Sequence, residues 1–132
     1  STYGGNPLAC DVGLAAFDTV NTPEVLNGVK VREQLFRDGL TAINAKYQVF
    51  SEIRGKGLLL GAALSADYAG KSRDFMLAAA EQGLLVLMAG YNVVRFAPSL
   101  IIPEADIKAG LDKFDAAIAK IVAASNAAKN AV

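Results

Sequence analysis

Histidine is absent from this sequence, and cysteine occurs once, as Cys10. Without histidine, the chain cannot form a His-metal site, a Ser–His or Cys–His nucleophile pair, or the usual proton shuttle near neutral pH. A single cysteine excludes a disulfide within the chain and is typical of a reducing compartment. We therefore expect no metal site, no conventional nucleophile dyad, and a small buried side chain at Cys10.

Net charge and long apolar runs are also lacking. Lysine plus arginine and aspartate plus glutamate count thirteen each, so no net charge attracts nucleic acid or an anionic membrane. The longest apolar runs, at residues 57–66 and 83–90, are about half of the roughly 20 residues that a membrane helix needs. No secretory signal is visible. We expect a cytoplasmic protein with no nucleic-acid or membrane partner and, because the sequence opens on Ser1 instead of Met, a fragment.

Two helices are predicted in the first part of the chain, whose 132 residues have the length of one domain. Asn6 followed by Pro7 is typical of a helix start, because Asn accepts from unpaired amides and Pro has no amide to leave unpaired. This helix should run to about Asn21, and its apolar residues on nearly every side indicate an interface. Thr22 and Pro23 begin a longer helix. One apolar stripe predicts that it packs on the core: Val25, Val29, Phe36, Leu40, Ile43 and Tyr47.

The rest of the chain mixes strands and helices. Residues 49–65 indicate one bent strand or two, residues 71–82 a helix that ends at Gly83, and residues 84–89 and 92–99 a hairpin. A last helix opens at Pro103, and residues 125–132 should fray. Because the two strands of the hairpin are too closely linked for a crossover, the order predicts an α+β fold with a mainly antiparallel sheet.

Several residues are candidates for chemistry. Gly55, Gly57 and Gly61 are spaced one residue too long for a dinucleotide fingerprint and favour a bend or close packing. Arg95 interrupts an apolar strand on the face of Val93 and Ala97, so its charge needs a partner. That partner is either an internal carboxylate or a substrate carboxylate, and the pattern leaves both open.

Two further candidates have simpler interpretations. Glu52, two residues before Arg54 on the same strand face, provides a structural partner for that arginine. At the N-terminus, the hydroxyls of Ser1 and Thr2 precede flexible glycines and a helix start, where amides and hydroxyls can bind an anion. An ordinary turn before a capped helix is the alternative, and the residues alone favour it.

Three stretches closely resemble class III, pyridoxal-phosphate-dependent aminotransferases. They are STYGGNPLA at residues 1–9, EIRGKGLLLG at residues 52–61 and GLLVLMAGYNVVRFAPSLII at residues 83–102. Their spacing, with NTPEVLNGVK at residues 21–30, is most similar to the acetylornithine and succinylornithine aminotransferase branch. The resemblance covers nearly the whole chain.

The resemblance implies a fold and an activity. The fold is the C-terminal small domain of the aspartate-aminotransferase type, α/β in class at full length, with residues 1–21 joining the large and small domains and residues 22–132 forming the small domain. The full-length homodimer would move the δ-amino group of N-acetyl- or N-succinylornithine to 2-oxoglutarate through pyridoxal phosphate.

The resemblance also implies roles for single residues. Ser1 would contact the acylornithine, Thr2 would bind the cofactor phosphate in the neighbouring subunit, and Arg95 would anchor a substrate carboxylate. The lysine that holds the cofactor should lie upstream of Ser1, so we expect no catalytic residue in this chain and no transamination by it alone. Two alternatives stay open: an ornithine or 4-aminobutyrate aminotransferase, and a non-catalytic α+β dimerisation or binding module.

Overall fold

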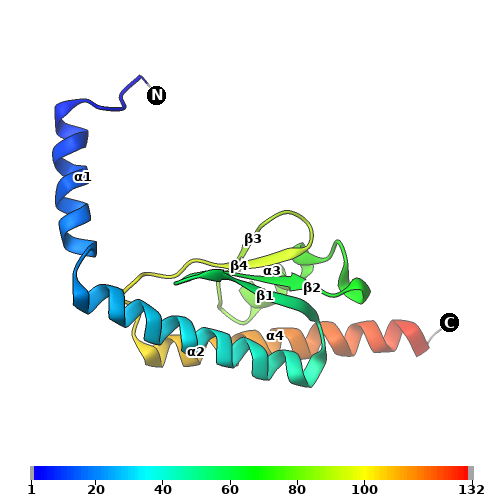
Figure 1. The fold of residues 1–132 in the computed structure, drawn as a ribbon. Coiled ribbons are helices and arrows are strands. Elements are labelled where there is room, and N and C mark those ends of the chain that lie inside the picture. The colour runs from blue at the N-terminus through cyan, green and yellow to red at the C-terminus, as the bar shows by residue number, and fades with distance from the viewer. Residues whose placement is uncertain (1, 131–132) are drawn as a thin grey trace.

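The computed structural model describes residues 2–130 as a two-layer α+β body with one helix standing apart from it (Figure 1). Residues 49–65, predicted as one bent strand or two, form a two-stranded hairpin, and the sheet order is β1-β2-β4-β3, with every pairing antiparallel. The expected α+β class with an antiparallel sheet is therefore confirmed. The elements are α1 (Pro7–Val20), α2 (Pro23–Tyr47), β1 (Phe50–Lys56), β2 (Leu59–Leu64), the 3-10 turn η1 (Ala66–Tyr68), α3 (Ser72–Glu81), β3 (Leu87–Met88), β4 (Val93–Phe96) and α4 (Glu104–Asn130).

Both predicted helix starts are confirmed by their capping bonds. The amide of Ala9 donates to Asn6 Oδ1 at 3.0 Å, and the amide of Val25 donates to Thr22 Oγ1 at 3.3 Å. Each cap is followed by a proline at the first helical position. The two caps fix a corner between α1 and α2, so that α1 points away from the body (Figure 1).

The core lies between one face of the sheet and helices α2, α3 and α4. The stripe predicted on the second helix supplies Phe36, Leu40 and Ile43 from α2, which are buried, and α4 adds the buried residues Ile107, Phe114 and Ile118. Aromatic rings from the sheet meet them there. The ring of Phe96 packs edge-on against Phe114 at 5.2 Å between centroids, and Phe50 stacks on Phe114 at 6.1 Å.

One edge of the sheet is closed by polar side chains of α2. Asn44 exchanges two hydrogen bonds with the backbone of Phe50, at 2.8 and 2.9 Å. Arg37 donates to the carbonyl oxygens of Ile53 and Gly55, at 3.3 and 2.7 Å. Glu33 accepts from the amide of Gly57 at 2.8 Å and also holds the Arg37 guanidinium. These bonds satisfy edge groups of β1 and its turn and tie the hairpin to the helix.

Three local expectations were wrong. Cys10 is exposed instead of buried, because α1 has no buried residue and lies off the body. The strand expected at residues 84–89 pairs only at Leu87–Met88, since the amide of Leu84 is still bonded to Ala79 at the end of α3. Residues 125–130 continue α4 instead of fraying, because no proline or glycine follows Gly110 to end the helix. Residues 131–132 lie outside the described part.

Candidate functional site

Arg95 lies on the face of the sheet that no helix covers. In β4, Val94 and Phe96 are buried in the core, whereas Val93 and Arg95 are partly exposed on the opposite face. Within residues 2–130, no hydrogen bond or ion pair engages the guanidinium of Arg95. The internal salt bridge that the sequence left open is therefore not formed in the described part of the chain, and the arginine can bind an external anion.

The neighbouring strands set the surroundings of Arg95. Gly61 of β2 is its direct partner on one side, and Leu87 of β3 is its partner on the other. Arg54 of β1 is in turn the partner of Gly61. Directly paired residues point to the same face of a sheet, so the two arginines flank the glycine. Both line one shallow depression, together with Leu59, Val93 and Ala89 among others.

The ion pair expected between Arg54 and Glu52 is confirmed. Arg54 Nη1 lies 3.3 Å from Glu52 Oε2, and both side chains are more than half exposed. The sequence reasoning assigned Arg54 to this pair alone and missed its position beside Gly61 and Arg95. The signal was the tight turn at Gly57, which sets the register of the hairpin and places Arg54 opposite Gly61.

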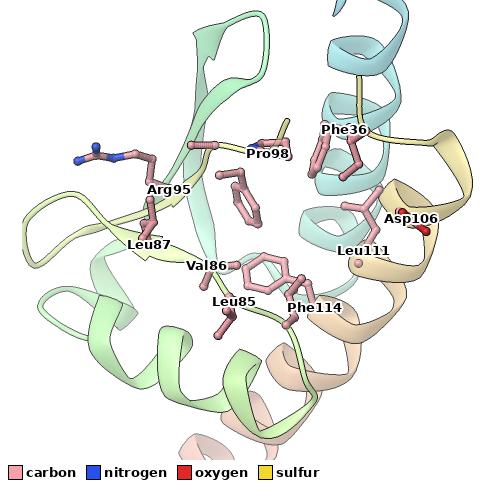
Figure 2. Close-up of a pocket in the computed structure, with 14 residues that line it drawn as sticks. Phe36, Leu85, Val86, Leu87, Arg95, Pro98, Asp106, Leu111 and Phe114 are labelled. Carbon is pink, nitrogen blue, oxygen red and sulfur yellow. The ribbon is translucent and has the colours of Figure 1, made fainter. Parts of the chain in front are cut away.

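An apolar cavity of about 220 Å³ opens on the other side of β4, between the segment that leads into β3 and helix α4. Figure 2 shows Phe36, Leu111 and Phe114 facing this cavity, while the guanidinium of Arg95 points away from it. Asp106 is the only acidic residue that lines it. A chemical site needs several convergent polar groups, so we assign the chemistry to the bare sheet face and not to this cavity.

Thr2 precedes α1, the helix that stands apart from the body, whereas Arg95 lies within the sheet. Thr2 is exposed in the turn before α1, and α1 is 14 residues, or about 21 Å, long (Figure 1). Gly5 has a φ of +82°, and Asn6 donates to the carbonyl of Tyr3 at 2.6 Å. No hydrogen bond is recorded for the Thr2 hydroxyl within the described residues. The structure therefore does not bring Thr2 and Arg95 together within one chain, and Ser1 lies outside the described residues.

Other kinds of site find no support in residues 2–130. No group of three or more cysteine, aspartate or glutamate side chains is placed to hold a metal ion. None of the helices in this range is both long and apolar enough to cross a membrane. The pKa of Lys46 is raised by its hydrogen bond and charge interaction with Asp115, but this pair lies between α2 and α4, away from both arginines.

Known proteins resemble this chain in sequence and in structure. The acetylornithine aminotransferase of Shewanella oneidensis is 69% identical over 124 residues, which are 94% of this chain and 31% of that protein. The succinylornithine transaminase of Yersinia enterocolitica is 56% identical over 92% of this chain and 29% of its own length. The crystal structure of N-acetylornithine aminotransferase from Stenotrophomonas maltophilia superposes with a TM-score of 0.84 at 45% identity, over 92% of this chain and 33% of that one.

A more distant structure carries information on a cofactor. The ornithine aminotransferase from Toxoplasma gondii, with pyridoxal phosphate at partial occupancy in its active site, matches at 27% identity and a TM-score of 0.82, over 96% of this chain and 30% of that one. This chain thus spans about a third of the length of its relatives. The family model for class-III aminotransferases matches residues 1–118. The chain therefore belongs to the class-III aminotransferase family.

Proposed function

We propose that this chain is the C-terminal part of an acylornithine aminotransferase. The complete enzyme would move the δ-amino group of N-acetyl- or N-succinylornithine to 2-oxoglutarate, giving the semialdehyde and glutamate, in the cytoplasm. The relatives named for acetylornithine or succinylornithine support this substrate class, at 54–69% identity among those compared. The structural observation that carries the proposal is Arg95, an arginine without an internal partner in the described chain, on a bare sheet face.

Arg95 is suited to anchoring a substrate carboxylate. A guanidinium presents two parallel N–H donors, which match the two oxygens of a carboxylate and fix its orientation. The backbone that carries Arg95 is held on both sides, by β2 and by β3, so the arginine is presented from a fixed strand. Fixing the substrate in this way lowers the entropic cost of reaching the reactive geometry.

Pyridoxal phosphate, when bound, would supply the electron sink for amino transfer. Thr2 fits one part of that group, because its exposed hydroxyl, in a turn that also contains Gly4 and Gly5, can donate to a phosphate oxygen. One hydroxyl is not a complete cofactor site, so the remaining cofactor ligands, including the lysine, would come from polypeptide outside these residues. Ser1, next to Thr2, would contact the acylornithine.

The separation of Thr2 from Arg95 supports a site shared between two subunits. In a single chain, Thr2 precedes the projecting helix α1, whereas Arg95 lies in the sheet of the body (Figure 1). In a homodimer, the turn before α1 of one subunit would reach the active site of its neighbour. Residues 1–21 would then join the large and small domains, and residues 22–132 would form the small domain.

The proposal is tested by comparing the isolated chain with the complete polypeptide. With pyridoxal phosphate, acetylornithine and 2-oxoglutarate, we expect glutamate formation by the complete polypeptide and none by residues 1–132 alone, because the cofactor lysine is missing from the latter. Turnover by the isolated chain would refute the assignment of catalysis to outside residues. A complete polypeptide that prefers ornithine or 4-aminobutyrate to both acylornithines would contradict the substrate class.

A further inference from the structure

An irregular segment, residues 97–103, carries the chain from β4 to α4, and we call it the connecting segment. Arg95 is the last residue but one of β4, so only Phe96 separates it from this segment. Phe96 is also the last residue of β4 that pairs with β2. A strand end opens more readily than its middle when the chain beyond it is loosely held. The position of Arg95 therefore depends on how firmly the connecting segment is fixed.

Packing fixes the connecting segment only in part. Leu100 and Ile102 pack partly against the core, but Ile101 is 67% exposed. Pro98 and Ile102 also line the apolar cavity of about 220 Å³, so part of the segment borders unfilled space (Figure 2). Atoms beside a void lose packing contacts on that side. A directional bond to the segment is correspondingly more important for holding it in place.

Arg32 of α2 supplies such a bond. Its Nε donates to the carbonyl oxygen of Ile102 at 2.7 Å. Within residues 2–130, this is the only recorded hydrogen bond from residues 97–102 to another part of the fold, since their other bonds lie within the segment. The guanidinium lies across Gly28, where a Cβ atom would overlap Nη1 of Arg32. The glycine thus leaves room for the arginine to reach the segment.

One face of α2 contacts both the end of β4 and the connecting segment. Phe36 follows Arg32 by four residues, so the two side chains lie on the same face of the helix. The ring of Phe36 packs against that of Phe96, with centroids 6.0 Å apart. This apolar contact is not directional, whereas the bond from Arg32 constrains both distance and angle. Arg32 therefore orients a backbone that packing alone holds loosely.

We propose that Arg32 is a positioning residue for Arg95. By tethering the connecting segment, Arg32 keeps the end of β4 paired and holds Arg95 where it meets the substrate carboxylate. This inference rests on the proposed function, in which Arg95 anchors that carboxylate, and it adds a residue on α2 that touches no substrate. A misplacement of about 1 Å in a binding group can reduce a rate by as much as about a hundredfold, so a single tether can matter for activity.

The test is a double-mutant cycle in the complete polypeptide, with Arg32→Gln and Arg95→Gln alone and combined. Arg32→Gln should raise the KM for 2-oxoglutarate about three- to tenfold in the parent, the scale of one hydrogen bond. In the Arg95→Gln background the same change should have less than about a twofold effect, because it acts through Arg95. An equal rise in both backgrounds would indicate a merely structural role, and that result or the absence of a rise would overturn the inference.

Two further variants separate the tether from a general loss of folding or charge. Arg32→Lys should keep the KM within about twofold of the parent, because an ammonium can donate to a single carbonyl oxygen. Lys30→Gln removes a positive charge from an exposed position of the same helix and should also leave the KM within about twofold. A rise in either variant as large as that in Arg32→Gln would contradict the inference.

Hydrogen exchange provides a readout that does not depend on turnover. Peptides that cover residues 93–103 should exchange about three- to tenfold faster in Arg32→Gln than in the parent, while peptides from α3 should not change. Unchanged exchange at residues 93–103 would overturn the inference. If Arg95→Gln alone leaves the KM unchanged, the proposed role of Arg95 fails and this inference fails with it. If Arg95→Gln raises the KM and Arg32→Gln does not, only this inference fails.

Discussion

At the scale of single residues, Arg95 shows how a charge can be placed for binding. Its neighbours along the strand, Val94 and Phe96, are buried and fix the strand against the core, so the arginine must project to the other face. The strand alternation predicted this direction from the sequence. The absence of an internal partner within residues 2–130 was not predictable, because it depends on which carboxylates the fold brings near β4.

Substitution of Arg95 by alanine in the complete enzyme should weaken the handling of 2-oxoglutarate or glutamate by about 2–4 kcal/mol, the size of a lost bidentate charge contact. The measurement is kcat/KM for each half-reaction, with Arg73→Ala as a control, since Arg73 is an exposed arginine on α3 and not on the bare sheet face. Unchanged kinetics for both diacids would refute the role of Arg95.

Substitution of Thr2 by alanine should loosen the retention of pyridoxal phosphate in the complete enzyme, because one hydrogen bond to the phosphate is lost. We expect the dissociation constant of the cofactor to rise by about ten- to a hundredfold, the effect of one hydrogen bond to a charged group. Dialysis followed by absorbance titration measures it. Equal cofactor affinity in the variant and the parent would count against this role.

At the scale of elements, the polar clamp from α2 onto the β1–β2 hairpin is the feature that sequence patterns did not reveal. Glu33 and Arg37 are one turn apart on α2, where i,i+4 charge pairs are common and usually contribute little. Here the same two side chains also bind backbone groups of Ile53, Gly55 and Gly57. A helix pattern cannot show which strand edge the helix will meet.

Substitution of Arg37 by alanine should therefore lower the free energy of unfolding by about 1–3 kcal/mol, because carbonyl acceptors and the Glu33 carboxylate lose their donor. Arg37→Lys should restore only part of this, since an ammonium cannot present the same fork of donors. Urea denaturation of the 132-residue chain provides the measurement. A loss no larger than that of Arg73→Ala would show that the clamp does not stabilise the hairpin.

At the scale of the whole molecule, α1 is the helix that is not packed against the rest of the described chain. Its apolar residues have no partner in the described part: Leu8 is 74% exposed, Val12 60% and Phe17 60%. A helix of this length is marginal in water by itself, so its stability depends on packing against something else. The sequence predicted an interface here from the apolar residues around the helix, but not that the whole helix would project from the body.

The isolated chain should accordingly self-associate in a concentration-dependent manner, as exposed apolar patches promote. Replacing Leu8, Val12 and Phe17 together by glutamine should abolish this association while keeping the helix, because glutamine is a good helix former. Analytical ultracentrifugation measures the association. Leu85→Gln, at a fully exposed position near β3, serves as the control and should still associate. A parent chain that stays monomeric would contradict the expectation.

The sequence by itself determined the local structure and the family. Caps at Asn6 and Thr22, apolar stripes on α2 and α4, and the alternation around Arg95 all depend on residues close in the chain, where spacing fixes geometry. Tertiary structure decided what depends on distant residues meeting. Cys10 is exposed, α2 closes the edge of β1, and the expected strand at residues 84–89 is reduced to Leu87–Met88. Arg54, Gly61 and Arg95 lie in one row. The reason is that sheet register and helix docking bring together positions that no local pattern connects.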